Sequence, residues 1–180
     1  NGPNALLNGV SPGQSVAGAI NLVPKRAADV PVRRLIGEYL SDSSFGARLD
    51  VGQRFGSANE WGVRVNASSL GGDTPVGGNH SRMSDIAVAL DYRGDRFRIA
   101  TDVVHSRQRI HGAVRGYALA PGLAVPEAPA PRRNVHQPYE YFENQDSFIS
   151  TRAELDLSAQ ATVFAAFGAA KRWEGSFATD

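Results

Sequence analysis

Residues 108–146 place guanidinium and imidazole groups close in sequence to several aromatic rings. Guanidinium groups donate paired hydrogen bonds to anionic oxygen atoms, and aromatic rings stack against cationic or planar groups. A proline-rich run, residues 121–131, favours a loop here. The stretch therefore either holds a bulky anionic or aromatic ligand, or is a solvated loop whose charges face water. The residues that carry this chemistry are Arg109, Tyr117, Arg132, Arg133, His136, Tyr139, Tyr141 and Phe142.

The sequence contains no clear motif for binding phosphate or a metal ion. Gly13 and Gly18 have the spacing of a phosphate-binding loop, but alanine and isoleucine follow where lysine and serine or threonine are needed. His105 and His111 lie too far apart on an extended strand to converge on one metal ion. We therefore predict no metal site and no cofactor.

Paired charges that resemble catalytic groups have a simpler explanation. Arg96 and Arg98, like Glu154 and Asp156, are two residues apart, so on a strand each pair shares one face. No serine lies in a nucleophile motif. The formal net charge of +1 gives no case for nucleic acid, and the absence of cysteine excludes disulfides and thiolate metal sites. The sequence predicts that the protein is not an enzyme.

Alternating apolar and polar residues recur along most of the 180 residues. Phe45, Leu49 and Val51, for example, alternate with Arg48 and Asp50. This period of two predicts an all-β, antiparallel fold in which one face is apolar and the other carries both signs of charge. The predicted strands are residues 32–41, 45–55, 60–70, 83–93, 95–107, 146–157 and 162–173, with long loops at 71–82 and 108–146.

Alternation alone also fits a soluble β-sandwich, whose apolar faces meet in a core. The connections, however, alternate between short and long, which is typical of outer-membrane β-barrels with short periplasmic turns and longer outer loops. Segments of about ten residues suit tilted strands that cross the hydrocarbon layer. Aromatic residues at strand ends would then form the interfacial girdles or simply pack at those ends; they are Phe55, Trp61, Tyr92, Phe97 and Trp173.

The first 26 residues, NGPNALLNGVSPGQSVAGAINLVPKR, form a distinct motif. Pro3 can open a short turn that Gly9 closes, Pro12 and Gly13 form a tight turn, and Pro24 ends a short strand. The pattern resembles the last segment of the plug domain of TonB-dependent siderophore receptors. The matching residues are Gly2, Pro3, Ala5, Leu6, Leu7, Gly9, Pro12, Gly13, Gly18, Ala19, Ile20, Asn21, Pro24, Lys25 and Arg26.

The resemblance implies residues 1–28 as the end of a plug domain and residues 29–180 as about seven strands of a larger transmembrane β-barrel. It implies an outer-membrane receptor that binds a ferric siderophore, imports it with energy from TonB and contacts outer-membrane lipid. The iron would enter as a chelate, which needs no protein ligands, and nucleic acid is not an expected partner. The alternatives are a soluble β-sandwich binding or adhesion module and a small structural outer-membrane barrel.

Two further expectations follow from the resemblance. Lumen-facing residues would hold the plug through polar contacts, while Pro24, Lys25 and Arg26 would mark its junction with the wall. A partial barrel would leave unpaired strand edges, so the chain alone is expected to aggregate or to pair through them. The lumen-facing residues expected to make these contacts are Arg48, Arg54, Arg64, Asp91 and Arg98.

Overall fold

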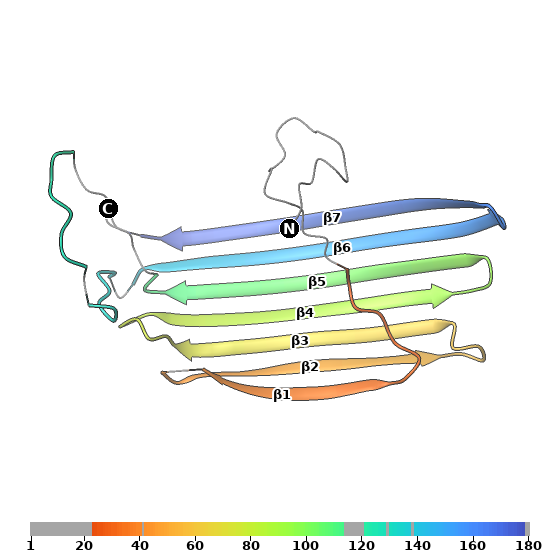
Figure 1. The fold of residues 1–180 in the computed structure, drawn as a ribbon, viewed down its shortest axis with the longest axis horizontal. Helices are drawn as coiled ribbons and strands as arrows, with labels where there is room; N and C mark the ends of the chain where they lie inside the picture. The colour runs from red at the N-terminus through yellow and green to blue at the C-terminus, as the bar shows by residue number, and fades with distance from the viewer. Residues whose placement is uncertain (1–22, 41, 114–120, 129, 138, 179–180) are drawn as a thin grey trace.

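The computed structural model describes residues 23–40, 42–113, 121–128, 130–137 and 139–178, which form one antiparallel sheet (Figure 1). The strands lie side by side in chain order, so each pairs with its sequence neighbour. Their bounds are β1 Val32–Leu40, β2 Ser44–Phe55, β3 Trp61–Asp73, β4 His80–Arg93, β5 Phe97–His111, β6 Tyr141–Ser158 and β7 Ala161–Phe177.

Cross-strand register aligns like residues on each face of the sheet. Val65 on β3 lies opposite Val88 on β4, which in turn lies opposite Val103 on β5. Such apolar pairs stabilise neighbouring strands, and the period of two places the polar residues between them on the other face. The sheet therefore has an apolar face and a polar face.

Among the described residues, no second layer of protein covers the apolar face. Phe167 is 68% exposed and Leu90 is 49% exposed, and no large side chain in the described part of the chain is fully buried. A soluble sandwich would bury this face between two sheets, whereas the described residues form a single sheet. The structure therefore contradicts the sandwich alternative. The sheet is also open rather than closed, unlike a small complete barrel, because β1 and β7 are its two edges.

The observed strands are longer than the sequence predicts at one end of the sheet. The expected loop at 71–82 shrinks to residues 74–79, and the expected loop at 108–146 shrinks to residues 112–140. The added strand segments break the alternation, because Arg82 and Arg109 lie on the otherwise apolar face while Ile110 and Phe142 lie opposite each other on the polar face. Hydrophobic periodicity therefore does not mark these segments, although backbone pairing continues. The β2–β3, β4–β5 and β6–β7 connections, all short, lie together at the opposite end of the sheet, whereas the short β1–β2 connection lies at the end with the long loops (Figure 1).

Residues 23–31, called the strap below, run across the sheet before joining β1 (Figure 1). Ala27, at the middle of the strap, is only 2% exposed. No helix in the described residues is long and apolar enough to cross a membrane. The rest of the plug-like motif, residues 1–22, lies outside the described residues.

Candidate functional site

The strap is tied to the polar face of the sheet by two ion pairs. Arg26 donates hydrogen bonds to both carboxylate oxygens of Asp102 on β5, with the Nη2–Oδ2 pair at 2.6 Å. Lys25 pairs with Asp50 on β2, with Nζ 3.4 Å from Oδ2. A bidentate arginine–carboxylate pair fixes orientation as well as distance, so Asp102 determines where the strap crosses β5.

Two arginines of the wall also bind the backbone of the strap. Arg64 on β3 donates from Nη1 to the carbonyl oxygen of Arg26 at 2.8 Å, and Arg54 on β2 donates to that of Ala27 at 3.3 Å. Arg64 is itself held by Asp50 through two hydrogen bonds of 2.8 Å. Backbone carbonyls in a segment without secondary structure need such donors when they are buried, and the polar face supplies them.

Arg54 forms a buried ion pair behind the strap. Its Nη1 lies 2.7 Å from Oδ2 of Asp91 on β4, and the two side chains are 2% and 5% exposed. Its remaining donors bind the carbonyl oxygens of Asn59 at 2.6 Å and Glu60 at 2.9 Å, both in the turn between β2 and β3. Arg54 therefore joins the turn, β4 and the strap through one guanidinium group.

Glycine at position 62 leaves room for this pair. A Cβ atom there would lie 2.6 Å from both Nη1 of Arg54 and Oδ1 of Asp91, closer than atoms approach without displacement. The small residue on β3 thus allows the guanidinium and the carboxylate to meet over the sheet.

All five predicted lumen residues lie on the polar face, but they do not all contact the strap. Arg54 and Arg64 do so directly, and Asp91 does so through Arg54. Arg48 instead pairs with Glu38 at 2.8 Å, and Arg98 pairs with Asp156 at 2.6 Å.

Asp50 and Asp102 were not predicted from the sequence as partners of the strap. Each lies at a polar-face position of its strand, which was the available signal, but the sequence does not say where the strap crosses.

The two long loops contact each other at the end of the sheet opposite the β2–β3 and β4–β5 turns. The Gly77 N–H donates to the carbonyl oxygen of Arg132 at 2.8 Å, and the imidazole of His136 packs against Gly78 and Gly112. An open polar cavity of about 390 Å³ lies among these loops; its lining includes Asp42, Asp73, Thr74 and Arg132.

The predicted ligand residues divide between this loop end and the strands. Arg132 and Arg133 are exposed on the loop, and Tyr139 packs edge-on against Phe177, with ring centroids 5.8 Å apart. Tyr117 lies outside the described residues. The remaining three belong to strands rather than to the predicted loop: Arg109 to β5, and Tyr141 and Phe142 to β6.

The strand alternation directs these three residues to different faces. Arg109 and Tyr141 share the apolar side of the sheet with Phe97, whereas Phe142 shares the polar side with Asp102. Within the described residues, no three His, Asp or Glu side chains are grouped so that they could hold a metal ion. The loop end thus offers guanidinium, imidazole and phenol groups.

Comparisons with known proteins identify this arrangement. No model of a known protein family matches the chain. The ferrichrome receptor FcuA of Yersinia enterocolitica is 38% identical over 174 residues, which cover 96% of this chain and 23% of that receptor. The structure of BauA, the ferric preacinetobactin receptor from Acinetobacter baumannii, superposes with a TM-score of 0.88 at 34% identity, covering 97% of this chain and 26% of BauA. These matches support the chain as a fragment of a TonB-dependent siderophore receptor.

A more distant receptor supports the same fold. The ferric-catecholate import receptor Fiu from E. coli K12 matches with a TM-score of 0.68 at 20% identity, over 95% of this chain and 26% of Fiu. The chain spans about a quarter of the length of the receptors that it matches. The seven-stranded antiparallel sheet thus corresponds to barrel wall in TonB-dependent siderophore receptors, as predicted.

Proposed function

We propose that the chain is part of an outer-membrane receptor that binds a ferric siderophore and imports it into the periplasm with energy transmitted by TonB. The observation that carries the proposal is the strap, clamped to the polar face of a sheet whose other face is apolar and exposed. A segment held inside a wall whose outside is apolar is the arrangement that a plugged barrel requires.

The dimensions of the apolar face support a membrane position. From Phe45 to Phe55 on β2, two exposed aromatic residues of this face, the chain advances ten residues, about 33 Å at roughly 3.3 Å per residue. With a strand tilt of about 45°, this length spans about 23 Å of membrane, close to the roughly 25 Å apolar band of outer-membrane barrels. At the short-turn end, an aromatic girdle contains Trp61 and Tyr92, whose ring centroids lie 4.8 Å apart.

In this orientation the short turns face the periplasm and the loop end faces outward. We infer that the loop end contributes to capture of the chelate through guanidinium donors and stacking rings. Its candidate residues are Arg132, Arg133, His136, Tyr139 and Phe142, together with Tyr117 outside the described residues. The relatives are named as receptors for ferrichrome and ferric preacinetobactin, so these two chelates are the first to test.

Uptake of radioactive iron tests the proposal. The full-length receptor is expressed in a strain that lacks its own siderophore receptors, and ⁵⁵Fe-ferrichrome and ⁵⁵Fe-preacinetobactin are supplied separately. We expect cell binding of at least one chelate with or without TonB, but accumulation only with TonB. A receptor that binds neither chelate and supports growth on none of a wider panel of ferric chelates would contradict the proposal.

The strap has a mechanical part in this proposal. Residues 1–28 would be the end of the plug, and Lys25 and Arg26 would fix the last plug residues to the wall while TonB pulls on the remainder. Since the contacts to the strap come from β2, β3 and β5, they distribute the load over the sheet.

A further inference from the structure

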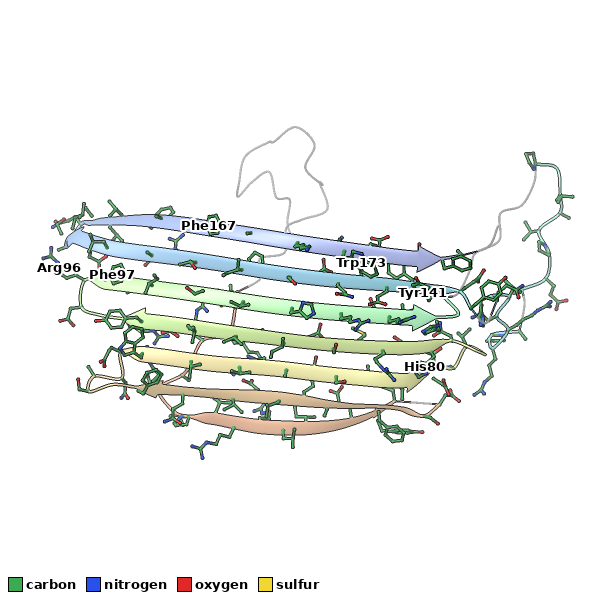
Figure 2. All side chains as sticks on the ribbon, turned by 180° about the vertical axis from the view of Figure 1, so that it is seen from behind. His80, Arg96, Phe97, Tyr141, Phe167 and Trp173 are labelled. Atoms are coloured by element: carbon green, nitrogen blue, oxygen red, sulfur yellow. The ribbon has the colours of Figure 1, made fainter. Side chains whose placement is uncertain are left out.

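Five basic side chains gather on the outward face of β4 and β5. They lie beyond the apolar belt, which is the band of exposed apolar side chains that includes Ile86, Leu90 and Val103. This outer basic cluster consists of His80 and Arg82 on β4 and Arg107, Arg109 and His111 on β5. Its residues share a face with the exposed apolar side chains Ile86, Leu90 and Val103, so they point away from the strap. Figure 2 shows His80 at the loop end of the sheet, opposite the end that carries Phe97.

Register brings two like charges directly opposite each other in this cluster, because Arg82 lies across from Arg109. The imidazole of His80 lies across from that of His111. Like charges at facing positions of neighbouring strands destabilise the pair unless an anion lies between them. A cavity of about 190 Å³ is lined by these same four residues, so there is room for such an anion.

Protein carboxylates neutralise only part of the cluster. Glu143 on β6 accepts from Arg107, with Oε1 2.6 Å from Nη2, and lies 3.6 Å from Arg109. Asp73 pairs with His80 at 3.0 Å. Arg82 is exposed and has no ion pair with any described residue, and the buried Nε of Arg109 has no hydrogen-bond partner among them. Donors thus remain available on both sides of the cavity.

The position of the cluster relative to the apolar belt indicates which anion it meets. Arg82 is ten residues from the girdle residue Tyr92, and Arg109 is twelve from Phe97. Along tilted strands these lengths correspond to about 23 Å and about 28 Å of membrane, at the outer boundary of the hydrocarbon layer and just beyond it. Lipid phosphate groups lie at this depth. Tyr141, 4.9 Å from the Arg109 guanidinium, adds an amphipathic ring of the kind found at membrane interfaces.

We propose that Arg82 and Arg109, supported by His80, Arg107 and His111, form a binding site for the phosphate group of an outer-leaflet lipid. The phosphate lies between β4 and β5 and accepts hydrogen bonds from both guanidinium groups, while the acyl chains lie along the apolar belt below. This inference rests on the proposed membrane position of the sheet, but not on siderophore transport. It gives Arg109 and Tyr141 a partner other than the chelate.

Lipid binding to the purified full-length receptor tests the site. The receptor is held in neutral detergent micelles that contain phosphatidic acid, which bears a phosphate monoester, or phosphatidylcholine, which bears no net charge. Retained lipid is measured by native mass spectrometry over a range of lipid concentrations. We expect Arg82→Gln to weaken retention of phosphatidic acid by about 10-fold, the loss of one charge-assisted hydrogen bond, with little change for phosphatidylcholine. Arg82→Lys should retain most of the binding.

Arg96→Gln is the matched control, since it removes the same charge at the short-turn end of the sheet (Figure 2). Retention equal to that of the unaltered receptor is expected for this variant. Equal retention of phosphatidic acid by Arg82→Gln would overturn the proposal. Inorganic phosphate is added as a competitor. If it displaces phosphatidic acid with an affinity equal to that of the lipid, the site binds free phosphate, and the assignment to a lipid is overturned. Siderophore uptake is measured in parallel, so its failure is seen separately from failure of lipid binding.

Discussion

Arg54 and Asp91 meet across β3 in a buried ion pair, with Nη1 2.7 Å from Oδ2. The pair stabilises the wall, because Arg54 also donates to two carbonyl oxygens of the β2–β3 turn. It also belongs to the junction with the strap, because Arg54 donates to the carbonyl oxygen of Ala27. Stability of the wall and position of the strap therefore depend on the same guanidinium group.

Asp91→Asn tests the contribution of this pair. The substitution retains the shape of the side chain but leaves the guanidinium of Arg54 buried without its counter-charge. Breaking a buried ion pair by removing one partner costs about 3–5 kcal/mol. We expect a destabilisation near the lower value, because Arg54 keeps its three carbonyl acceptors. We expect a lower midpoint of unfolding for the full-length receptor, measured by differential scanning calorimetry. Asp146→Asn, which breaks the exposed pair with Arg172, is the control and should change the midpoint little.

Gly62→Ala should destabilise the receptor although the added group is only a methyl. The new Cβ would lie 2.6 Å from atoms of both Arg54 and Asp91, neither of which can move without breaking the pair. Overpacking of this kind costs about 1–3 kcal/mol. Gly37→Ala on β1 is the matched control, because a Cβ atom added there would meet no neighbouring atom within 4 Å. Equal unfolding midpoints for the two variants, measured by the same calorimetry, would contradict the close approach at position 62.

Asp102→Asn should loosen the strap. The change removes a bidentate partner of Arg26, and a hydrogen bond to a charged group contributes about 1.5–3 kcal/mol. Amide hydrogens of the strap should therefore exchange about 10-fold to 100-fold faster, as measured by hydrogen–deuterium exchange mass spectrometry. In cells, uptake of the chelate should slow while its binding affinity stays unchanged.

Asp156→Asn provides the control for the strap. It removes a carboxylate on the same face that pairs with Arg98 at the short-turn end of the sheet, and not with Lys25 or Arg26 of the strap. Exchange in the strap should stay as in the unaltered receptor. If both variants speed the exchange equally, the effect comes from general loss of charge in the lumen and not from the Arg26–Asp102 contact.

Much of the fold could be predicted because apolar and polar residues alternate clearly along most strands. Val88 and Val103 alternate with polar-face neighbours, and a one-residue slip in register would turn them into the lumen. The extension of β5 to His111 and of β6 from Tyr141 could not be predicted in this way. There the alternation breaks down, because Arg107 and Glu143 pair on the otherwise apolar face while Ile110 and Phe142 lie opposite each other on the polar face. Backbone pairing continues without a hydrophobic pattern to mark it.

The sequence predicted which types of residue hold the strap, but it predicted less well which residues they contact. Arg54 and Arg64 were expected to hold the plug from their polar-face positions, and they do contact the strap. Asp102 was missed because its role depends on where a segment distant in sequence crosses the sheet, 76 residues away from Arg26. Such long-range contacts follow from the barrel geometry and are not encoded in local spacing.

The imidazole of His111, beyond the apolar belt, reports on the outer basic cluster. Burial is the main reason that its pKa lies below the ordinary value, and the charges of Arg109, His80 and Arg82 lower it further. Glu143 acts in the opposite direction. The side chains that face it from β4, β5 and β6 are His80, Arg82, Arg109, Tyr141 and Glu143.

Arg82→Gln should raise the pKa of His111, because it removes one of the cations that disfavour the imidazolium form. Titration of the full-length receptor with ¹³C-labelled histidine, followed by NMR and assigned with a His111→Gln variant, measures the change. Arg96→Gln, at the other end of the sheet, should leave this pKa unchanged. Phosphatidic acid should raise the pKa of His111 in the unaltered receptor, because a phosphate beside the ring favours the charged form. A pKa of His111 that is insensitive both to Arg82→Gln and to the lipid would show that the two histidine-bearing strands do not bring these charges together.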